Sequence, residues 1–156
     1  MTTPSGPVVS HRFRVGLLAG AFSCLMLSAA QAGHPRVEDW QGQYTCGQGL
    51  TGLTLAMTTD LSGQVQALFH FYGIPQNPTV PDGCFMMSGS VQARHLVLLP
   101  GEWRKHPANY VSVGLTGDFG ADERLAGTIT GPGCTVFMLS RVAQAPVLDD
   151  CGSAIS

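Results

Sequence analysis

The sequence predicts an all-β fold in which about eight antiparallel strands follow one another as a meander and close into a small, disulfide-stapled barrel. From Tyr44 onward, short runs alternate apolar and polar residues with a period of two, which is typical of half-buried strands. The 20 glycines and 10 prolines among the 156 residues favour turns over helices. Four cysteines after residue 32 form an even set, as disulfides require. A two-sheet β-sandwich is the alternative architecture.

Residues 1–32 predict a cleaved signal peptide. A basic start precedes the apolar run 15–27 and the small residues that end at Ala32, and a signal peptidase accommodates such residues. The apolar run is shorter than the roughly 20 residues of a bilayer span, which argues against a retained anchor. Acylation of Cys24 is also disfavoured, because the apolar stretch continues past it. Cleavage after Ala32 leaves residues 33–156 as one domain in the periplasm or outside the cell.

The charge of the processed chain disfavours two classes of partner. Two of the eight basic residues and none of the ten acidic ones lie in residues 1–32, so the net charge afterwards is 6 − 10 = −4. Nucleic-acid binders usually show the opposite bias. No polybasic run is present to hold an anionic membrane after cleavage of the signal.

The clearest strand patterns lie early in the domain. Run 53–58 places Leu53, Leu55 and Met57 on one face, and run 65–71 does the same for its apolar positions. Residues 60–63, which end in glycine, predict the hairpin turn between them. The other predicted strands are 43–47, 85–91, 95–99, 110–119, 124–131 and 135–141. Glycines inside strands favour a barrel, because they permit sharp bends: Gly89, Gly114, Gly117 and Gly127.

The four cysteines of the domain predict two disulfides in an oxidising compartment. They allow three pairings, and the sequence by itself does not choose one. Cys46–Cys134 with Cys84–Cys151 is favoured, because Cys46 lies in the first predicted strand and Cys134 at the start of the last, and these strands become neighbours when a meander closes. No C-x-x-C spacing or adjacent histidine supports a zinc site, and no metal or cofactor is expected.

Several segments resemble a family of small secreted bacterial domains of uncharacterised function that also occur appended to caspase-like peptidases. The resemblance rests on residues 40–55 (WQGQYTCGQGLTGLTL), 75–78, 100–103, 107–110 and 133–141. It implies export, one β domain and a Cys46–Cys134 bridge, and it brings no activity with it.

Two weaker likenesses concern single positions. The combination of an early tryptophan, Trp40, and a late arginine, Arg141, is similar to that of the calycin barrels, in which the tryptophan packs under the arginine and closes one end. Residues 44–46 resemble the opening of periplasmic lysozyme inhibitors of the C-type class, whose later motif is missing here.

Segment 100–110 is the main candidate binding site, predicted as a loop between two strands. It concentrates aromatic and basic side chains: Trp103, Arg104, Lys105, His106 and Tyr110. Such residues on a loop of a rigid scaffold are frequent anchors of interfaces. In the alternative interpretation, Trp103 and Tyr110 plug the end of the barrel.

A second candidate is the proline-rich segment 72–83. Its prolines restrict the backbone and could present Gln76 and Asn77 rigidly to a partner. It could equally be a crossing connection that a disulfide at Cys84 holds in place.

No catalytic or metal constellation is predicted. The histidines lack ligand spacing and are interpreted as surface residues: His34, His70, His95 and His106. The methionines are interpreted as core residues rather than copper ligands: Met57, Met86, Met87 and Met138. Ser88 lacks the G-x-S-x-G context of a nucleophile.

The sequence therefore predicts an exported binding module without catalytic activity that recognises an envelope or extracellular protein through residues 100–110. The alternatives are a carrier of a small apolar ligand inside the barrel, an accessory structural domain, and a protein similar to hydrolase inhibitors. An interior filled by core side chains would exclude the carrier: Leu53, Phe69, Phe71, Val113 and Phe137.

Overall fold

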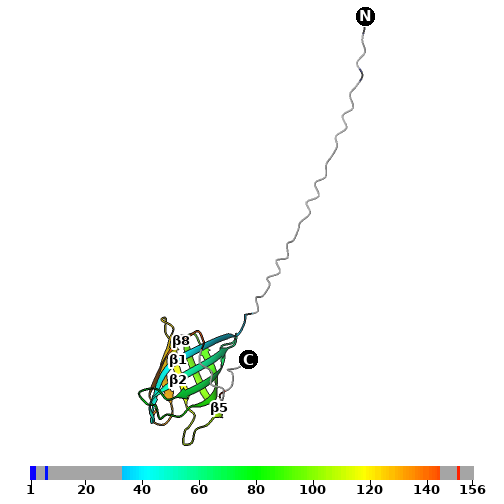
Figure 1. Ribbon diagram of the computed structural model, residues 1–156. Helices are drawn as coiled ribbons and strands as arrows, with labels where there is room; N and C mark the ends of the chain where they lie inside the picture. Colours follow the sequence, from blue (N-terminus) through cyan, green and yellow to red (C-terminus); the bar gives the residue numbers. More distant parts are fainter. Residues whose placement is uncertain (3–5, 7–32, 145–150, 152–156) are drawn as a thin grey trace. The chain divides into compact units, whose positions relative to one another are not determined.

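The computed structural model describes residues 1–2, 6, 33–144 and 151, and it confirms the predicted barrel of eight antiparallel strands (Figure 1). The strands are β1 (Arg36–Cys46), β2 (Gly49–Thr59), β3 (Gln64–Tyr72), β4 (Gly83–Gln92), β5 (His95–Lys105), β6 (Gly114–Phe119), β7 (Arg124–Thr130) and β8 (Val136–Val142). Each strand pairs with the next, and β8 pairs with β1, so the sheet has no free edge. The predicted signal peptide and its cleavage point lie outside the described residues apart from positions 1, 2 and 6.

The hairpin between β2 and β3 forms as its residues predict. The Asp60 carboxylate accepts hydrogen bonds from the backbone N–H groups of Ser62 (2.8 Å) and Gln64 (2.9 Å). Gly63 has φ +83°, a left-handed conformation that glycine adopts without strain. These contacts fix the turn, and the two strands that it joins pair in register from Gly52 opposite Tyr72 to Thr59 opposite Val65.

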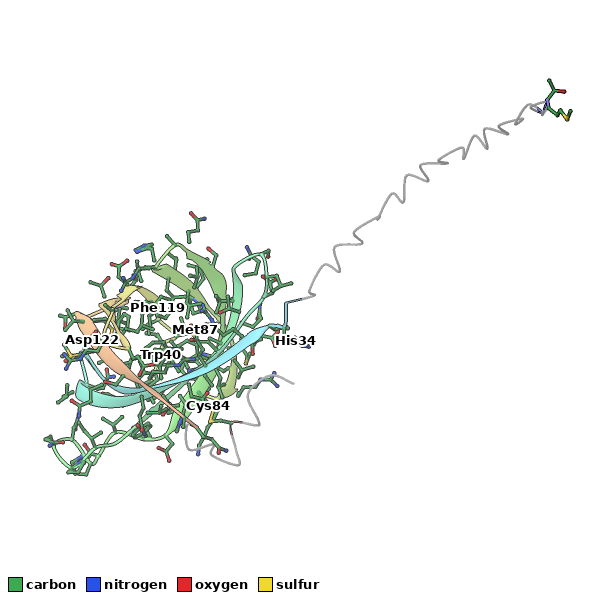
Figure 2. The ribbon with its side chains drawn as sticks, turned by 90° about the horizontal axis from the view of Figure 1, so that it is seen from above. His34, Trp40, Cys84, Met87, Phe119 and Asp122 are labelled. Carbon is green, nitrogen blue, oxygen red and sulfur yellow. A yellow bond between two sulfur atoms is a disulfide. The ribbon has the colours of Figure 1, made fainter. Side chains whose placement is uncertain are left out.

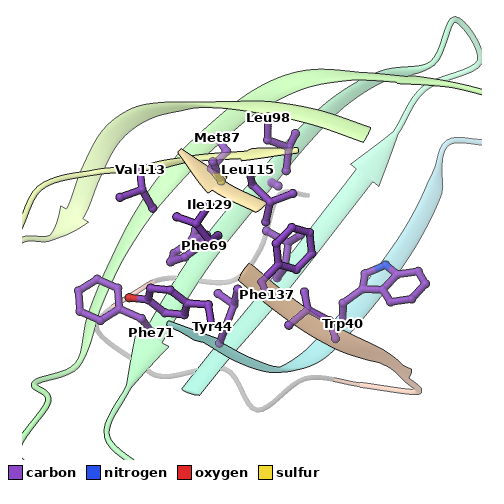
Figure 3. Close-up of a cluster of buried hydrophobic side chains, with 14 of the residues drawn as sticks. Trp40, Tyr44, Phe69, Phe71, Met87, Leu98, Val113, Leu115, Ile129 and Phe137 are labelled. Carbon is purple, nitrogen blue, oxygen red and sulfur yellow. The ribbon is translucent and has the colours of Figure 1, made fainter. Parts of the chain in front are cut away.

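Inward side chains from all eight strands form one core. The alternation of β3 is confirmed, since Val65, Ala67, Phe69 and Phe71 are all buried inside the barrel. Figure 3 shows the cluster, with Tyr44, Phe71 and Val113 toward one end and Trp40 toward the other.

The ring of Phe137 needs a glycine on a neighbouring strand. A Cβ added at Gly117 would lie 2.6 Å from the Cζ atom of Phe137, and Gly117 pairs with a second inward glycine, Gly127. The small residues on β6 and β7 therefore make room for a large ring from β8 in the middle of the barrel.

Two predicted boundaries are wrong. Residues 100–105 belong to strand β5 and not to a loop, while the strand predicted over 110–119 begins only at Gly114. The register against β4 shifts between the pairs Met87–Pro100 and Phe85–Trp103. Such a bulge lets a strand continue past a proline that cannot donate a ladder hydrogen bond.

The outer face of β2 to β4 has its own small apolar cluster, in which Ala56, Leu68, Cys84 and Cys151 are buried and Met86 packs against them. The disulfide Cys84–Cys151 holds Cys151 on this face (Cys84 is labelled in Figure 2). Because these apolar side chains pack together, an outward position on β2 to β4 does not have to be exposed to solvent.

The predictions for one histidine and one methionine are corrected accordingly. His70 points to the outer face but is only 5% exposed, so it is not a surface residue. Met138, interpreted as a core residue, points outward on β8 and is 59% exposed, because nothing among the described residues covers that face. Met57 and Met87 are in the core as predicted, whereas Met86 is not, since it is half-buried against the cluster on the outer face.

The favoured pairing of the cysteines is the one that the structure contains, Cys46–Cys134 and Cys84–Cys151. Cys46 ends β1, and Cys134 lies just before β8, the strand that closes the barrel against β1. The first bond therefore lies at the seam of the barrel.

One end of the barrel is closed by Trp40 and an ion-pair network above it. Trp40 packs against Phe119 with ring centroids 5.3 Å apart, and it pairs across the seam with Arg141 (Figure 2 labels both aromatic residues). The buried carboxylate of Glu38 accepts from Arg141 (3.1 Å) and from Arg36 (3.2 Å). A cavity of about 250 Å³ remains beside these residues, and a larger one lies at the opposite end, which we call the open end.

Candidate binding site at the open end of the barrel

A cavity of about 400 Å³ lies at the end of the barrel where β1 turns into β2 and where the connections β5–β6 and β7–β8 meet. Five aromatic side chains form much of its wall: Tyr44, Phe69, Phe71, Phe85 and Tyr110. Val113 is buried beside them, whereas Val111 and Asn109 are exposed at the rim.

The aromatic rings are arranged in stacked pairs. Phe69 of β3 stacks on its cross-strand partner Phe85 of β4, with ring centroids 4.8 Å apart and planes at 18°. Phe71 stacks on Tyr110 at 5.2 Å and 15°. Tyr44 meets Phe69 edge to face at 5.4 Å. Alternation along β3 places Phe69 and Phe71 on the same inner face, so both rings take part in the aromatic portion of the cavity wall.

A small polar network lies beside these rings. The side-chain amide of Gln48 donates to the Tyr44 hydroxyl (3.0 Å) and lies 3.3 Å from the Thr51 hydroxyl oxygen, while Thr51 donates to the carbonyl of Gly49 (3.1 Å). Burial, with a smaller contribution from Tyr110, raises the pKa of Tyr44 above its usual range. The phenol of Tyr44 is therefore neutral at physiological pH.

The Cys46–Cys134 disulfide is part of the cavity wall. Next to it, the backbone N–H of Thr135 donates to the carbonyl of Thr45 (2.9 Å). The covalent bond and the hydrogen bond together hold the β7–β8 connection against the end of β1, which fixes one side of the opening.

Residues of the predicted site around 100–110 divide between the inside and the outside of the barrel. Trp103 is half-buried and packs edge to face on Phe85 at 4.9 Å, and His106 stacks on Trp103 at 4.2 Å. Tyr110 packs on the core, and its carbonyl lies 2.8 Å from Nε2 of His106. These contacts agree with the interpretation in which Trp103 and Tyr110 plug the barrel end.

The two basic residues of that segment do not join the cavity. Arg104 is exposed at the bulge of β5, and Lys105 lies opposite Cys84 on the outer face. Trp103 and Lys105 therefore face opposite sides of the strand and do not form one surface.

The second predicted pair has different roles. The Asn77 side chain donates to the backbone carbonyls of Gln48 (2.7 Å) and Leu50 (3.1 Å), which clamps the β1–β2 turn at the cavity. Gln76 is exposed and does not line the cavity. Asn77 thus supports the site through Gln48.

Sequence reasoning missed most residues of the cavity. Alternation marks Phe69, Phe71 and Phe85 as inward, but it cannot distinguish a filled core from a cavity wall. Asn109 has the left-handed φ of +64°. The alternation over residues 110–119 predicted a strand there and gave no indication of a turn. Gln48 lies two residues after Cys46, and its place next to a predicted disulfide was the only indication in the sequence that it could belong to a site.

Other chemistry is not evident in the described part of the chain. Within it, no group of three or more His, Cys, Asp or Glu side chains could hold a metal ion. Over the same residues, no helix is long and apolar enough to cross a membrane.

Comparisons with known proteins found no matching family model, no matching curated protein and no matching solved structure. The resemblances to secreted bacterial domains, to calycins and to lysozyme inhibitors therefore stay predictions.

Proposed function

We propose that the protein is an exported binding module that holds a small, largely apolar molecule at the open end of its barrel. The aromatic-lined cavity is the observation on which this proposal depends, since about 400 Å³ lies within the roughly 300–1,000 Å³ typical of small-molecule sites. The mouths of β-barrels are frequent places for such sites.

The molecule would lie at the mouth and not in the middle of the barrel. The side chains expected to fill the interior are all in the core, with at most 6% of each residue exposed: Leu53, Phe69, Phe71, Val113 and Phe137. This packing, part of which Figure 3 shows, argues against a ligand enclosed deep inside and favours the cavity at the open end.

Recognition of an envelope protein through residues 100–110 has less support. An aromatic anchor of an interface projects into a pocket of its partner. Trp103 and Tyr110 instead pack on Phe85 and Phe71 of their own chain. Action in the periplasm or outside the cell agrees with two disulfides in one small domain.

Titration with the uncharged fluorophore N-phenyl-1-naphthylamine tests the proposal. Val111 is 61% exposed at the rim, so Val111→Trp can occupy the opening without disturbing the core. Leu99→Trp adds the same side chain at a 62% exposed position of β5 that does not line the cavity.

We expect saturable binding to the wild type and to Leu99→Trp, and an affinity lower by about tenfold or more for Val111→Trp, equivalent to about 1.4 kcal/mol. Absence of saturable binding to the wild type, or equal affinity of the two tryptophan variants, would contradict the proposal.

A further inference from the structure

We infer that the molecule held at the open end is an uncharged, planar ring compound whose single polar group faces the rim near Gln48. The inference rests on the proposed function, and it specifies the chemical class that the cavity accepts. Three properties of the wall support it: its charge, its shape and the position of its polar groups.

The wall offers no partner for a charged group. Among the described residues that line the cavity there is no Asp, Glu, Lys or Arg, and the Tyr44 phenol is neutral. A carboxylate or ammonium group transferred from water into such surroundings would lose its hydration without gaining a counter-charge. The cavity therefore selects against ions.

Stacked aromatic rings make up much of the wall. Phe69 with Phe85, and Phe71 with Tyr110, form two stacked pairs whose planes differ by 18° and 15°. Because the rings of each pair face one another and Phe69, Phe71 and Phe85 are at most 2% exposed, a bound flat ring would meet mainly their edges, in the edge-to-face arrangement that aromatic groups prefer. A puckered saturated ring of the same carbon skeleton has no aromatic face for such a contact.

The polar groups lie toward the opening. The amide nitrogen of Gln48 is held by the hydroxyl groups of Tyr44 and Thr51, which orients the side chain. The backbone carbonyl of Gln48 accepts from Asn77, but its side-chain oxygen, Oε1, makes no hydrogen bond to a described residue and can accept one from a bound hydroxyl group. Asn109, also part of the wall, is exposed. A ligand would thus direct its polar end outward and its ring inward.

Displacement of bound N-phenyl-1-naphthylamine by three competitors at pH 7 tests the inference on the wild-type protein, expressed from its full sequence. 2-Naphthol has the proposed properties, 2-naphthoate adds a negative charge to the same ring, and decahydro-2-naphthol keeps the carbon skeleton but is puckered. We expect 2-naphthol to displace the probe at concentrations lower by about tenfold or more than 2-naphthoate and by about fivefold or more than decahydro-2-naphthol.

A cation placed at the rim should reduce or reverse the preference for 2-naphthol over 2-naphthoate. In Gln48→Lys we expect 2-naphthoate to gain about tenfold relative to 2-naphthol, whereas Leu50→Lys, on the outer face of the neighbouring strand, should leave the ratio unchanged. The wild-type series decides the question by itself if Gln48→Lys does not fold.

The outcomes separate this inference from the proposed function. If the probe binds but 2-naphthoate or decahydro-2-naphthol competes as well as 2-naphthol, the uncharged planar class is overturned and the binding function stands. If the probe itself does not bind, the proposed function fails first.

Discussion

Removal of the Cys46–Cys134 disulfide tests how the seam of the barrel contributes to stability and to the cavity. The bond joins residues 88 positions apart, at the end of β1 and just before β8. In the chain-entropy model, a loop of that length restricts the unfolded chain by about 4.6 kcal/mol. For Cys84–Cys151, with a separation of 67, the same relation gives about 4.4 kcal/mol.

The two disulfides should therefore contribute nearly equally to the stability of the protein but differ in their effect on binding. Cys46 and Cys134 line the cavity, whereas Cys84 and Cys151 lie in the cluster on the outer face. We expect each double alanine variant to lose about 4–5 kcal/mol in its free energy of unfolding. Only the pair Cys46→Ala/Cys134→Ala should bind N-phenyl-1-naphthylamine more weakly.

Urea unfolding followed by circular dichroism measures the first effect, and probe titration of the folded variants measures the second. With a slope of about 2 kcal/mol per molar urea, the midpoint should fall by about 2 M in both cases. A loss below about 1 kcal/mol would refute the loop-entropy argument. Equal loss of probe affinity in both double variants would refute the assignment of the first bond to the cavity wall.

Three further substitutions test the barrel. Gly117→Ala should cost about 1–3 kcal/mol by overpacking, because its Cβ would lie 2.6 Å from neighbouring atoms, whereas Gly47→Ala, with nothing within 4 Å, should be neutral in thermal unfolding. Glu38→Gln should cost about 1–3 kcal/mol in urea unfolding, because the charged acceptor of the Arg141 guanidinium (3.1 Å) is lost, and an unchanged free energy of unfolding would contradict a stabilising ion pair. Burial lowers the pKa of His70 in the folded state below its ordinary 6.5, so its neutral form contributes stability that is complete above pH 6.5 and declines as the pH falls below that value. His70→Phe should reduce this decline between pH 7.5 and 5, and an unchanged pH dependence would contradict the argument.

Local pattern was sufficient for much of the fold. Alternation along β3 placed Phe69 and Phe71 inside, and the turn at residues 60–63 formed through contacts within its own few residues. These features depend on interactions between neighbours in sequence, which is why the strands, their order and the hairpin could be predicted. The favoured disulfide pairing followed from one topological step, the proximity of the first and last strands in a closed meander.

Only the tertiary structure decided which outward positions are covered and which inward positions leave space. His70 is buried opposite Cys84, whose disulfide partner Cys151 is far away in sequence. Trp103 belongs to a strand because the bulge against β4 lets β5 continue past Pro100. In the sequence by itself, this proline indicates the end of a strand. Rings from β3, β4 and the β5–β6 connection line the cavity, and no periodicity along one segment specifies how completely rings from three segments fill a shared volume.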